Sequence, residues 1–395
     1  MSSTASIAGT DRERLPAILW PLLFGNFVIG SGVMVVPGAL NDIKDSLGVS
    51  VATAGQLISA CALMMCIGAP VLAAFVAGWD RRRLLALSML WYGLLHFACI
   101  AAPNFATLLA LRVLAVISPA IFTPQAAASV GLLVSPAQRG RAIAFLFLGW
   151  SIASVLGSPM GAYVGGTFGW RSAFALIGVM SLVSALWVWL RMPDGVKPPA
   201  LSFAAWSETF RSQALMLSVA VTVAYSAGQF ALLSYLAPYY KEKIGMTPGE
   251  IGLMFMWFGV FGFIGNMLMA RYIDRIGAPR AVMISVTLMA LTMLVWPLGT
   301  SLAVAAAVLV PWGLGCFAAN SAQQARLVGI APPLAPASIA LNSSAIYAGQ
   351  AVGAAGGGWL IAQGAIDSLH WAGLVALLVA AVLSAWATTF SHRGR

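Results

Sequence analysis

The stretch LLALSMLWYGLLHFACI, residues 84–100, and the stretch AVAAAVLVPWGLGCFAA, residues 303–319, are almost continuously apolar. A bilayer-spanning helix needs about 20 mainly apolar residues, and neither stretch shows the alternation of polar and apolar residues that a membrane β-strand requires. Of the 395 residues, 61% are hydrophobic and 8% are charged, whereas soluble domains are about 25% charged. The sequence therefore predicts an all-α polytopic membrane protein with room for about twelve spans.

We expect these spans to be separated at clusters of charged residues, Pro and Gly. They are predicted near residues 16–40, 51–78, 84–101, 105–133, 138–166, 171–190, 213–240, 249–273, 278–298, 301–328, 337–364 and 369–390. The longest loop is polar and rich in Pro, and it falls midway along the chain. We therefore expect an N-terminal six-helix bundle at 1–191, a cytosolic linker at 192–212 and a C-terminal six-helix bundle at 213–395.

The basic residues are divided unequally between the two sides of this map. If the N-terminus is cytosolic, sixteen Lys and Arg lie on the cytosolic side, and four lie outside: Lys44, Arg171, Lys241 and Lys243. Positively charged loops remain in the cytosol, so both termini are expected there and the protein in a bacterial-type inner membrane. The net charge of +10 is spread over short loops, which predicts contact with anionic lipids in the bilayer and not with nucleic acid.

The two halves carry the same pattern at the end of their second span. Gly68 precedes the pair Asp80-Arg81 by twelve residues, and Gly262 precedes Asp274-Arg275 by twelve. A parallel repeat of this kind is the organisation of many secondary transporters, in which two bundles rock about a site between them.

The segments that follow the second span of each half resemble the Gly-x-x-x-Asp-Arg-x-Gly-Arg-Arg signature of the major facilitator superfamily. We call them the two corners; they read AGWDRRRLLAL from Ala77 and ARYIDRIGAPR from Ala270. In the first corner Val76 and Arg83 replace the two Gly of the signature. The fifth span, LGWSIASVLGSPMGAYVGG from Leu148, is similar to the antiporter motif of the family's twelve-span drug and sugar efflux branch. The resemblance covers essentially the whole chain and implies two pseudo-symmetric bundles of six helices.

The resemblance also implies roles for both motifs. Asp80, Arg81, Asp274 and Arg275 would form a latch on the cytosolic side, since a carboxylate is favoured at the positive end of a helix; the alternative is that they only anchor the span ends. Gly149, Gly157, Pro159 and Gly161 would allow close helix packing and a bend in span 5. The alternative for these is the ordinary small-residue packing of any membrane helix.

Arg112 is the one Lys or Arg that the map places inside a span. A cation in hydrocarbon is costly unless it faces protein or water, and the family carries an Arg here that is implicated in proton transfer. Snorkelling to the outer headgroups is the alternative. Val33 stands where many relatives have an acid, and no Asp or Glu falls at the bilayer midplane, so a proton would need another carrier. The candidates are Asp42, Glu250 and His96. The alternative for Asp42 and Glu250 is a charge at the membrane interface, and the alternative for His96 is a packed peripheral histidine.

The resemblance places spans 1, 4, 7 and 10 around a central substrate cavity. The predicted substrate-binding residues are polar or aromatic and near mid-span: Asn26, Arg112, Gln125, Tyr225, Gln229, Asn320, Gln323, Asn342 and Tyr347. Tyr225 and Gln229 are four residues apart, and therefore share one face of a helix. Helix-to-helix hydrogen bonding is the alternative role for each amide.

These observations predict a secondary transporter that exports a small uncharged or amphipathic organic compound by alternating access, with protons as a candidate coupling ion. A facilitator or importer without proton coupling is the alternative, and a membrane partner or sensor is a third. Three histidines and no midplane acid leave little material for acid-base or metal chemistry. We therefore expect no enzyme activity, cofactor or metal site, and a protein that acts as a monomer.

Overall fold

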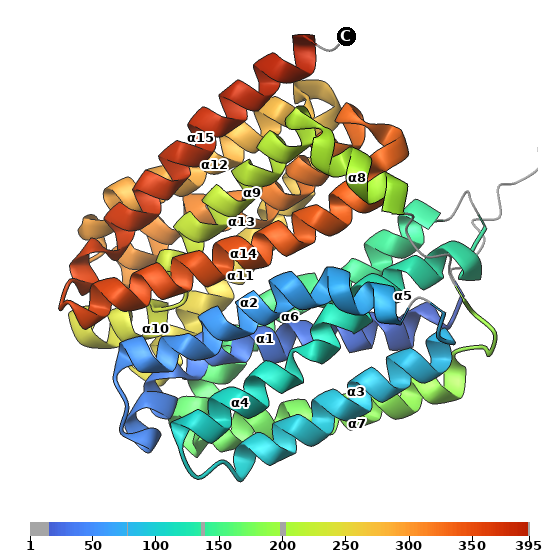
Figure 1. The fold of residues 1–395 in the computed structure, drawn as a ribbon. Coiled ribbons are helices and arrows are strands. Elements are labelled where there is room, and N and C mark those ends of the chain that lie inside the picture. Colours follow the sequence, from blue (N-terminus) through green and yellow to red (C-terminus); the bar gives the residue numbers. More distant parts are fainter. Residues whose placement is uncertain (1–15, 77, 136–138, 198–202, 394–395) are drawn as a thin grey trace, which may run out of the picture.

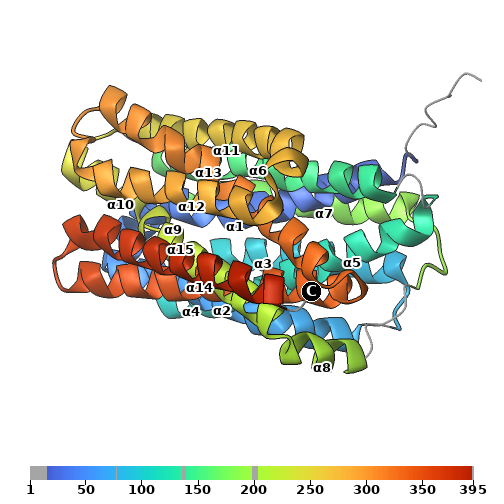
Figure 2. The same cartoon turned by 90° about the horizontal axis from the view of Figure 1, so that it is seen from above.

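The computed structural model describes residues 16–76, 78–135, 139–197 and 203–393, and the regular structure in these ranges is helical. The helices form two bundles that lie side by side (Figures 1 and 2). We call the end that carries residues 192–197 and α8 (Phe203–Arg211) the linker end. The end that carries α10 (Leu236–Tyr239) is called the far end (Figure 1).

The first bundle contains α1 (Leu19–Leu47), α2 (Val51–Phe75), α3 (Arg81–Ile100), α4 (Phe105–Ala115), α5 (Ile117–Leu133), α6 (Arg139–Phe168) and α7 (Trp170–Arg191). The second contains α9 (Gln213–Leu233), α10, the π-helical turn Tyr240–Ile244, α11 (Pro248–Ile276), α12 (Ala278–Val295), α13 (Leu302–Ile330), α14 (Ala335–Ala362) and α15 (Leu369–Arg393).

Eleven segments of the described residues are long and apolar enough to cross a membrane. The twelfth span is α14, which has 28 residues but carries Asn342, Gln350, three Ser and five Gly. Its length suffices for a bilayer, while its polar side chains lower its hydropathy. The predicted all-α membrane fold of two six-helix bundles is therefore confirmed.

Proline explains two helix breaks that the predicted spans did not include. Residues 105–133 divide into α4 and α5 at Val116, where Pro119 has no N–H for the carbonyl of Ala115. Residues 213–240 divide after Leu233, where Pro238 has the same effect on the carbonyl of Ser234. Both breaks place a kink within a span that borders the contact between the bundles.

The first span was predicted to end at residue 40, but α1 continues to Leu47 and ends at Gly48. Gly48 has φ of 64°, a left-handed conformation that suits glycine as a helix terminator. The charged residues Asp42, Lys44 and Asp45 therefore belong to the last turns of the helix and not to a loop.

The outer surface of the bundles is strongly apolar. Leu190, Val382 and Trp359 are 67%, 68% and 63% exposed, and a soluble monomer rarely presents apolar patches on such a scale. Buried Ser, Asn, Gln and Arg side chains lie inside. This inside-out distribution fits a bilayer as the solvent of the helices.

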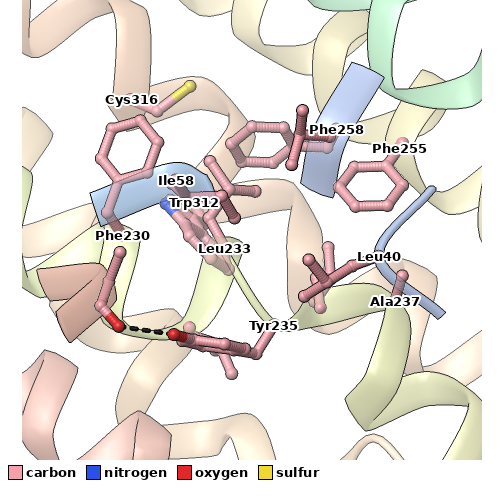
Figure 3. Packing of buried hydrophobic residues seen from close by; sticks show 14 of the residues in the cluster. Leu40, Ile58, Phe230, Leu233, Tyr235, Ala237, Phe255, Phe258, Trp312 and Cys316 are labelled. Atoms are coloured by element: carbon pink, nitrogen blue, oxygen red, sulfur yellow. Dashed lines mark hydrogen bonds between the residues drawn. The ribbon is translucent and has the colours of Figure 1, made fainter. Parts of the chain in front are cut away.

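The two ends of the molecule differ in how the bundles are packed. At the far end one continuous cluster of buried residues joins them, with Leu40 and Ile58 of the first bundle beside Tyr235 and Phe255 of the second (Figure 3). At the linker end each bundle has a separate cluster, built around Met89 in the first and Leu327 in the second.

Candidate functional site

Arg112 occupies the end of α4, just before the kink at Val116. The α4 helix starts at Asn104, whose side chain accepts a hydrogen bond from the N–H of Thr107 at 3.0 Å. Arg112 is 1% exposed, and Trp91 of α3 donates to the carbonyl of Leu114 near the kink. The arginine is thus held inside the first bundle, and the snorkelling alternative is wrong.

Arg112 joins three helices. Its Nη2 donates to the carbonyl of Gly32 in α1 at 2.9 Å, and its Nη1 lies 2.9 Å from Nε2 of His96 in α3. The guanidinium carbon is also 5.1 Å from the ring centre of Phe174 in α7, a distance suited to a cation–π contact. Within the described residues no carboxylate forms an ion pair with Arg112.

The hydrogen bonds of His96 define its tautomer. Its Nδ1 lies 2.8 Å from the carbonyl of Tyr92, and because a carbonyl only accepts, Nδ1 carries the hydrogen. Arginine only donates, so the lone pair of Nε2 accepts from Arg112. His96 is 0% exposed and is neutral in this arrangement. It is a partner of Arg112 and not a peripheral packed histidine.

A small cavity lies beside Arg112 at the contact between the bundles. Its volume of ≈ 10 Å³ is about that needed for one water molecule. Val33, Cys61 and Arg112 line it from the first bundle, and Gln350 of α14 lines it from the second. Val33 therefore lies at the same cavity as the buried arginine.

The second bundle contains a chain of neutral hydrogen bonds. The hydroxyl of Thr222 in α9 donates to Oδ1 of Asn342 in α14 at 2.6 Å. Nδ2 of Asn342 donates to Oδ1 of Asn320 in α13 at 3.1 Å, which also accepts from Gln324 at 3.4 Å. Asn320 and Asn342, both predicted from the sequence, are thus brought together by three helices.

Other predicted residues of this bundle retain unused polar atoms. Within the described part of the chain, the hydroxyl of Tyr225 and the Oε1 atoms of Gln229 and Gln323 are buried without a hydrogen-bond partner. Nε2 of Gln323 donates to the carbonyl of Ser218. Buried polar atoms are normally paired, so these atoms mark places where a ligand, water or a change of conformation can supply the missing bond.

The remaining predicted substrate residues are divided between the bundles. Asn26 in α1 accepts a hydrogen bond from Thr123 at 2.7 Å and donates weakly to the carbonyl of Leu146 at 3.4 Å. Gln125 in α5 is buried. Tyr347 in α14 crosses to the first bundle, where it packs against a cluster that contains Cys61.

Asp80 has one partner in its own bundle and one in the linker in this conformation. Its Oδ1 caps α3 by accepting from the N–H of Arg83 at 3.2 Å, and its Oδ2 accepts from the N–H of Gly195 at 2.6 Å. Arg81 donates to the carbonyls of Val76 and Trp79. Asp274 and Arg275 are exposed near the end of α11. The four latch residues are thus not gathered at one contact here.

The span 5 motif lies at the seam between α6 and α1. A Cβ atom built on Gly149 would meet the backbone of Leu23 and Phe27, and one on Gly161 would meet the backbone of Val35. A Cβ on Gly157 would lie 3.0 Å from the Cα of Ser31. Pro159 stands inside α6 between these glycines. The seam holds α1, and with it the Gly32 carbonyl that Arg112 binds.

Arg326 corrects the expectation that Arg112 is the one basic residue inside a span. It lies in α13, is 3% exposed, and donates to Oγ of Ser384 at 3.0 Å and to Thr388 at 2.9 Å in α15. The sequence interpretation placed it among the basic residues at span ends. Arg326 follows Gln323 by three residues and therefore shares its helix face. This spacing could have indicated that Arg326 faces the interior of the bundle. Gln350 was missed as well, although it follows Tyr347 by three residues.

At the far end an ion pair connects the bundles. Lys241 Nζ lies 2.8 Å from Asp45, which also pairs with Lys44 at 3.0 Å. A cavity of ≈ 150 Å³ beside this pair is lined by Asp42, Lys241, Met246 and other residues of both bundles. Asp42 accepts from the N–H of Trp170.

The family model of the Major Facilitator Superfamily matches this chain at residues 22–240 and 219–394. The chain belongs to this superfamily of membrane transporters. It is 30% identical over 354 residues to the inner membrane transport protein YdhP of Escherichia coli K12, covering 88% of this chain and 90% of that protein. It is 31% identical over 265 residues to a chloramphenicol resistance protein of Streptomyces lividans, covering 66% of this chain and 68% of that one.

Solved structures agree in fold. A bacterial homologue of the human lysosomal transporter Spinster, in an inward-facing and unoccupied conformation, superposes with a TM-score of 0.75 at 19% identity, covering 96% of this chain and 98% of that one. A D-xylose-proton symporter superposes with a TM-score of 0.76 at 16% identity, covering 93% and 96%. At these identities the likeness concerns the fold alone.

Proposed function

We propose that this protein exports a small uncharged or amphipathic organic compound across a bacterial inner membrane by alternating access. The observation that carries the proposal is the difference between the two ends. The bundles share one apolar cluster at the far end and have separate clusters at the linker end, which supports a transporter that opens at one end at a time.

Charge supports an orientation with the linker end in the cytosol. Basic residues such as Arg83, Arg191 and Arg211 lie at the linker end, and positively charged loops are retained in the cytosol. In this orientation the end at which the bundles have separate clusters faces the cytosol, the side from which an exported compound is loaded. The termini are then both cytosolic.

The chemistry of the interior supports a substrate without a strong charge. The second bundle offers neutral amides and hydroxyls, with unused atoms on Tyr225 and Gln229. A site built to hydrogen-bond a polar group discriminates against analogues that lack it. Similarity to a chloramphenicol resistance protein and the span 5 motif both favour export over import. The substrate binds within the membrane, and a single chain contains both bundles that the cycle requires.

The test is transport by the purified protein in sealed vesicles with an imposed pH gradient. Chloramphenicol is the first probe, followed by a panel of drugs, sugars and amino-acid derivatives. Export requires that a probe move from the side of the linker end toward the far end, and that its movement exceed that in protein-free vesicles. Probe movement that only follows its own gradient, in both directions equally, would replace the exporter with a facilitator.

A cytosolic orientation of the linker end has a separate test. A reporter fused after Arg395 is expected to be active in the cytosol, and periplasmic activity would reverse the orientation.

A further inference from the structure

A transporter driven by protons needs a group that binds and releases a proton, and Arg112 cannot do so because its guanidinium remains protonated. His96 is the titratable partner that touches it, at 2.9 Å. The pair lies inside the first bundle with no ion-paired carboxylate among the described residues. Two adjacent positive charges in such a site repel each other strongly.

A proton on Nε2 of His96 is therefore incompatible with the present hydrogen bond. Nδ1 already carries a hydrogen that it donates to Tyr92, and Nε2 has a single lone pair, which Arg112 occupies. Protonation of His96 requires that Arg112 move away. The displaced guanidinium then needs another acceptor.

Gln350 can provide the acceptor for the displaced guanidinium. Its side chain is 6% exposed and lines the same small cavity as Arg112. Its amide oxygen is an acceptor on α14 of the other bundle. A guanidinium that turns from His96 toward this oxygen would exchange a contact within one bundle for a contact between the two.

The other titratable groups around the pair do not supply a negative charge. Tyr92 and Cys99 lie on α3, Cys61 on α2 and Tyr347 on α14. The ring of Tyr92 packs edge-on against His96 at 4.3 Å, and the neighbours from α7 and α1 are the ring of Phe174 and the carbonyl of Gly32. Among the described residues of these helices the carboxylates are Asp42 and Asp45 of α1, which lie at the far end and bond Trp170 and Lys241.

We propose that His96 is the proton-binding residue of this protein and that Gln350 holds Arg112 while the proton is bound. In the present conformation His96 is neutral and Arg112 bonds it. When water enters between the bundles from the far end, it delivers a proton to Nε2, the Arg112–His96 hydrogen bond breaks, and Arg112 turns to Gln350 across the cavity that both residues line. Return to the present conformation expels the same proton to water at the linker end. The direction of net transport in this cycle rests on the proposed export function.

The proton site can be tested without a transport substrate. Protein labelled at the histidine ring nitrogens is placed in lipid nanodiscs, and nitrogen NMR spectra are recorded as the pH is lowered; loss of one signal in His96→Gln assigns His96. The far end is locked in a second sample, in which Cys61, Cys66, Cys99 and Cys316 are replaced by Ser. Asp45→Cys and Lys241→Cys are then joined by a bifunctional thiol reagent, since these side chains already meet.

The expected result is that His96 titrates in the unlocked protein and keeps its neutral Nδ1–H spectrum in the locked protein over the same pH range. Gln350→Leu is expected to lower the titration midpoint by about one unit, a tenfold loss of proton affinity. The control Gln363→Leu changes an exposed glutamine at the end of the same helix and should leave the midpoint unchanged. Arg112→Gln removes the charge and should allow His96 to titrate even when locked.

Equal titration in locked and unlocked protein, or an absence of titration in both, would overturn the proposal. So would a Gln350→Leu midpoint equal to that of the control. These outcomes are independent of whether chloramphenicol is exported, so failure of the proton site and failure of the proposed function are distinguishable. In vesicles that do export a probe, His96→Gln is expected to retain movement down the probe's gradient and to lose its response to a pH gradient.

Discussion

The interiors of the two bundles use different chemistry. The first contains a charged arginine that joins α1, α3 and α4 through Gly32 and His96. The second contains neutral hydrogen bonds that connect α9, α13 and α14 through Thr222, Asn342 and Asn320. A charge responds to a proton, whereas neutral amides respond to the hydrogen-bonding groups of a solute.

The second bundle also contains a buried arginine, but in a different setting. Arg326 bonds Ser384 and Thr388 of α15, away from the cavity that Gln350 and Arg112 share. Arg326 therefore connects two helices of one bundle, while Arg112 lies where both bundles meet. A buried charge can couple to the transport cycle only where it lies at the contact between the bundles that changes during the cycle.

The largest effect is expected from Arg112→Ala. The change leaves Nε2 of His96 and the carbonyl of Gly32 without their donor, and hydrogen bonds to charged groups contribute about 1.5–3 kcal/mol each. Transport driven by a pH gradient should fall by about 10- to 100-fold in vesicles. Arg326→Ala is the matched loss of a buried arginine in the other bundle. It should lower stability while the remaining folded protein keeps its response to pH; equal loss of that response in both variants would remove the distinction between the bundles.

Gly161→Leu is expected to weaken the seam that positions α1. The new side chain would meet the backbone of Val35, which cannot move aside as a side-chain tip can, and overpacking costs about 1–3 kcal/mol. Thermal unfolding in detergent should show a lower midpoint. Gly356→Leu is the control, since a Cβ there meets no atom within 4 Å. Equal stability of the two variants would show that close packing at α6 is unimportant.

Asn342→Ala is expected to affect the neutral network and leave the proton response intact. It removes the partner of Thr222 and Asn320, and an unsatisfied buried group costs about 1–3 kcal/mol. The half-saturating concentration of a transported probe should rise about tenfold, since about 1.4 kcal/mol corresponds to one decade. Ser343→Ala, which removes a bond within α14 itself, is the neighbouring control. A shift of the pH profile in Asn342→Ala would contradict the division of labour between the bundles.

The smallest effect is expected from Asp80→Asn. Asn also caps helices well, so α3 should remain folded, while the loss of charge weakens the bond from the Gly195 N–H. Transport should slow by a few-fold, in line with charge effects of about 1 kcal/mol at helix ends. Asp274→Asn tests the corresponding corner of the second bundle. Unchanged rates in both variants would reduce the two corners to membrane anchors.

The fold could be predicted because hydrophobic stretches of sufficient length report directly on membrane spans. The limits of this signal are visible at Pro119 and Pro238, where a continuous apolar run hides a break. Hydropathy indicates which segments are apolar enough to enter the membrane. It does not indicate where a proline removes a backbone hydrogen bond within such a segment.

The site could be predicted in part. Arg112 stood out because a buried cation needs a partner, but its partners come from α1 and α3, and their approach depends on helix packing. Arg326 was misplaced because its position near the end of a span suggested an anchor, whereas Ser384 and Thr388 draw it inward. Gln350 carried no distinguishing signal beyond its spacing from Tyr347, since only the approach of α14 to α4 gives it a role.

The proposed export cycle requires that the two ends of the molecule open alternately. The most direct measurement uses pairs of spin labels in protein with its four native cysteines replaced, one pair at Ser46 and Glu242 on the far end and another at Arg83 and Arg275 on the linker end. Pulsed electron resonance then gives each distance as the pH is lowered. The account predicts that the far-end distance lengthens while the linker-end distance shortens. Distances that stay constant, or that lengthen together, would contradict alternating access.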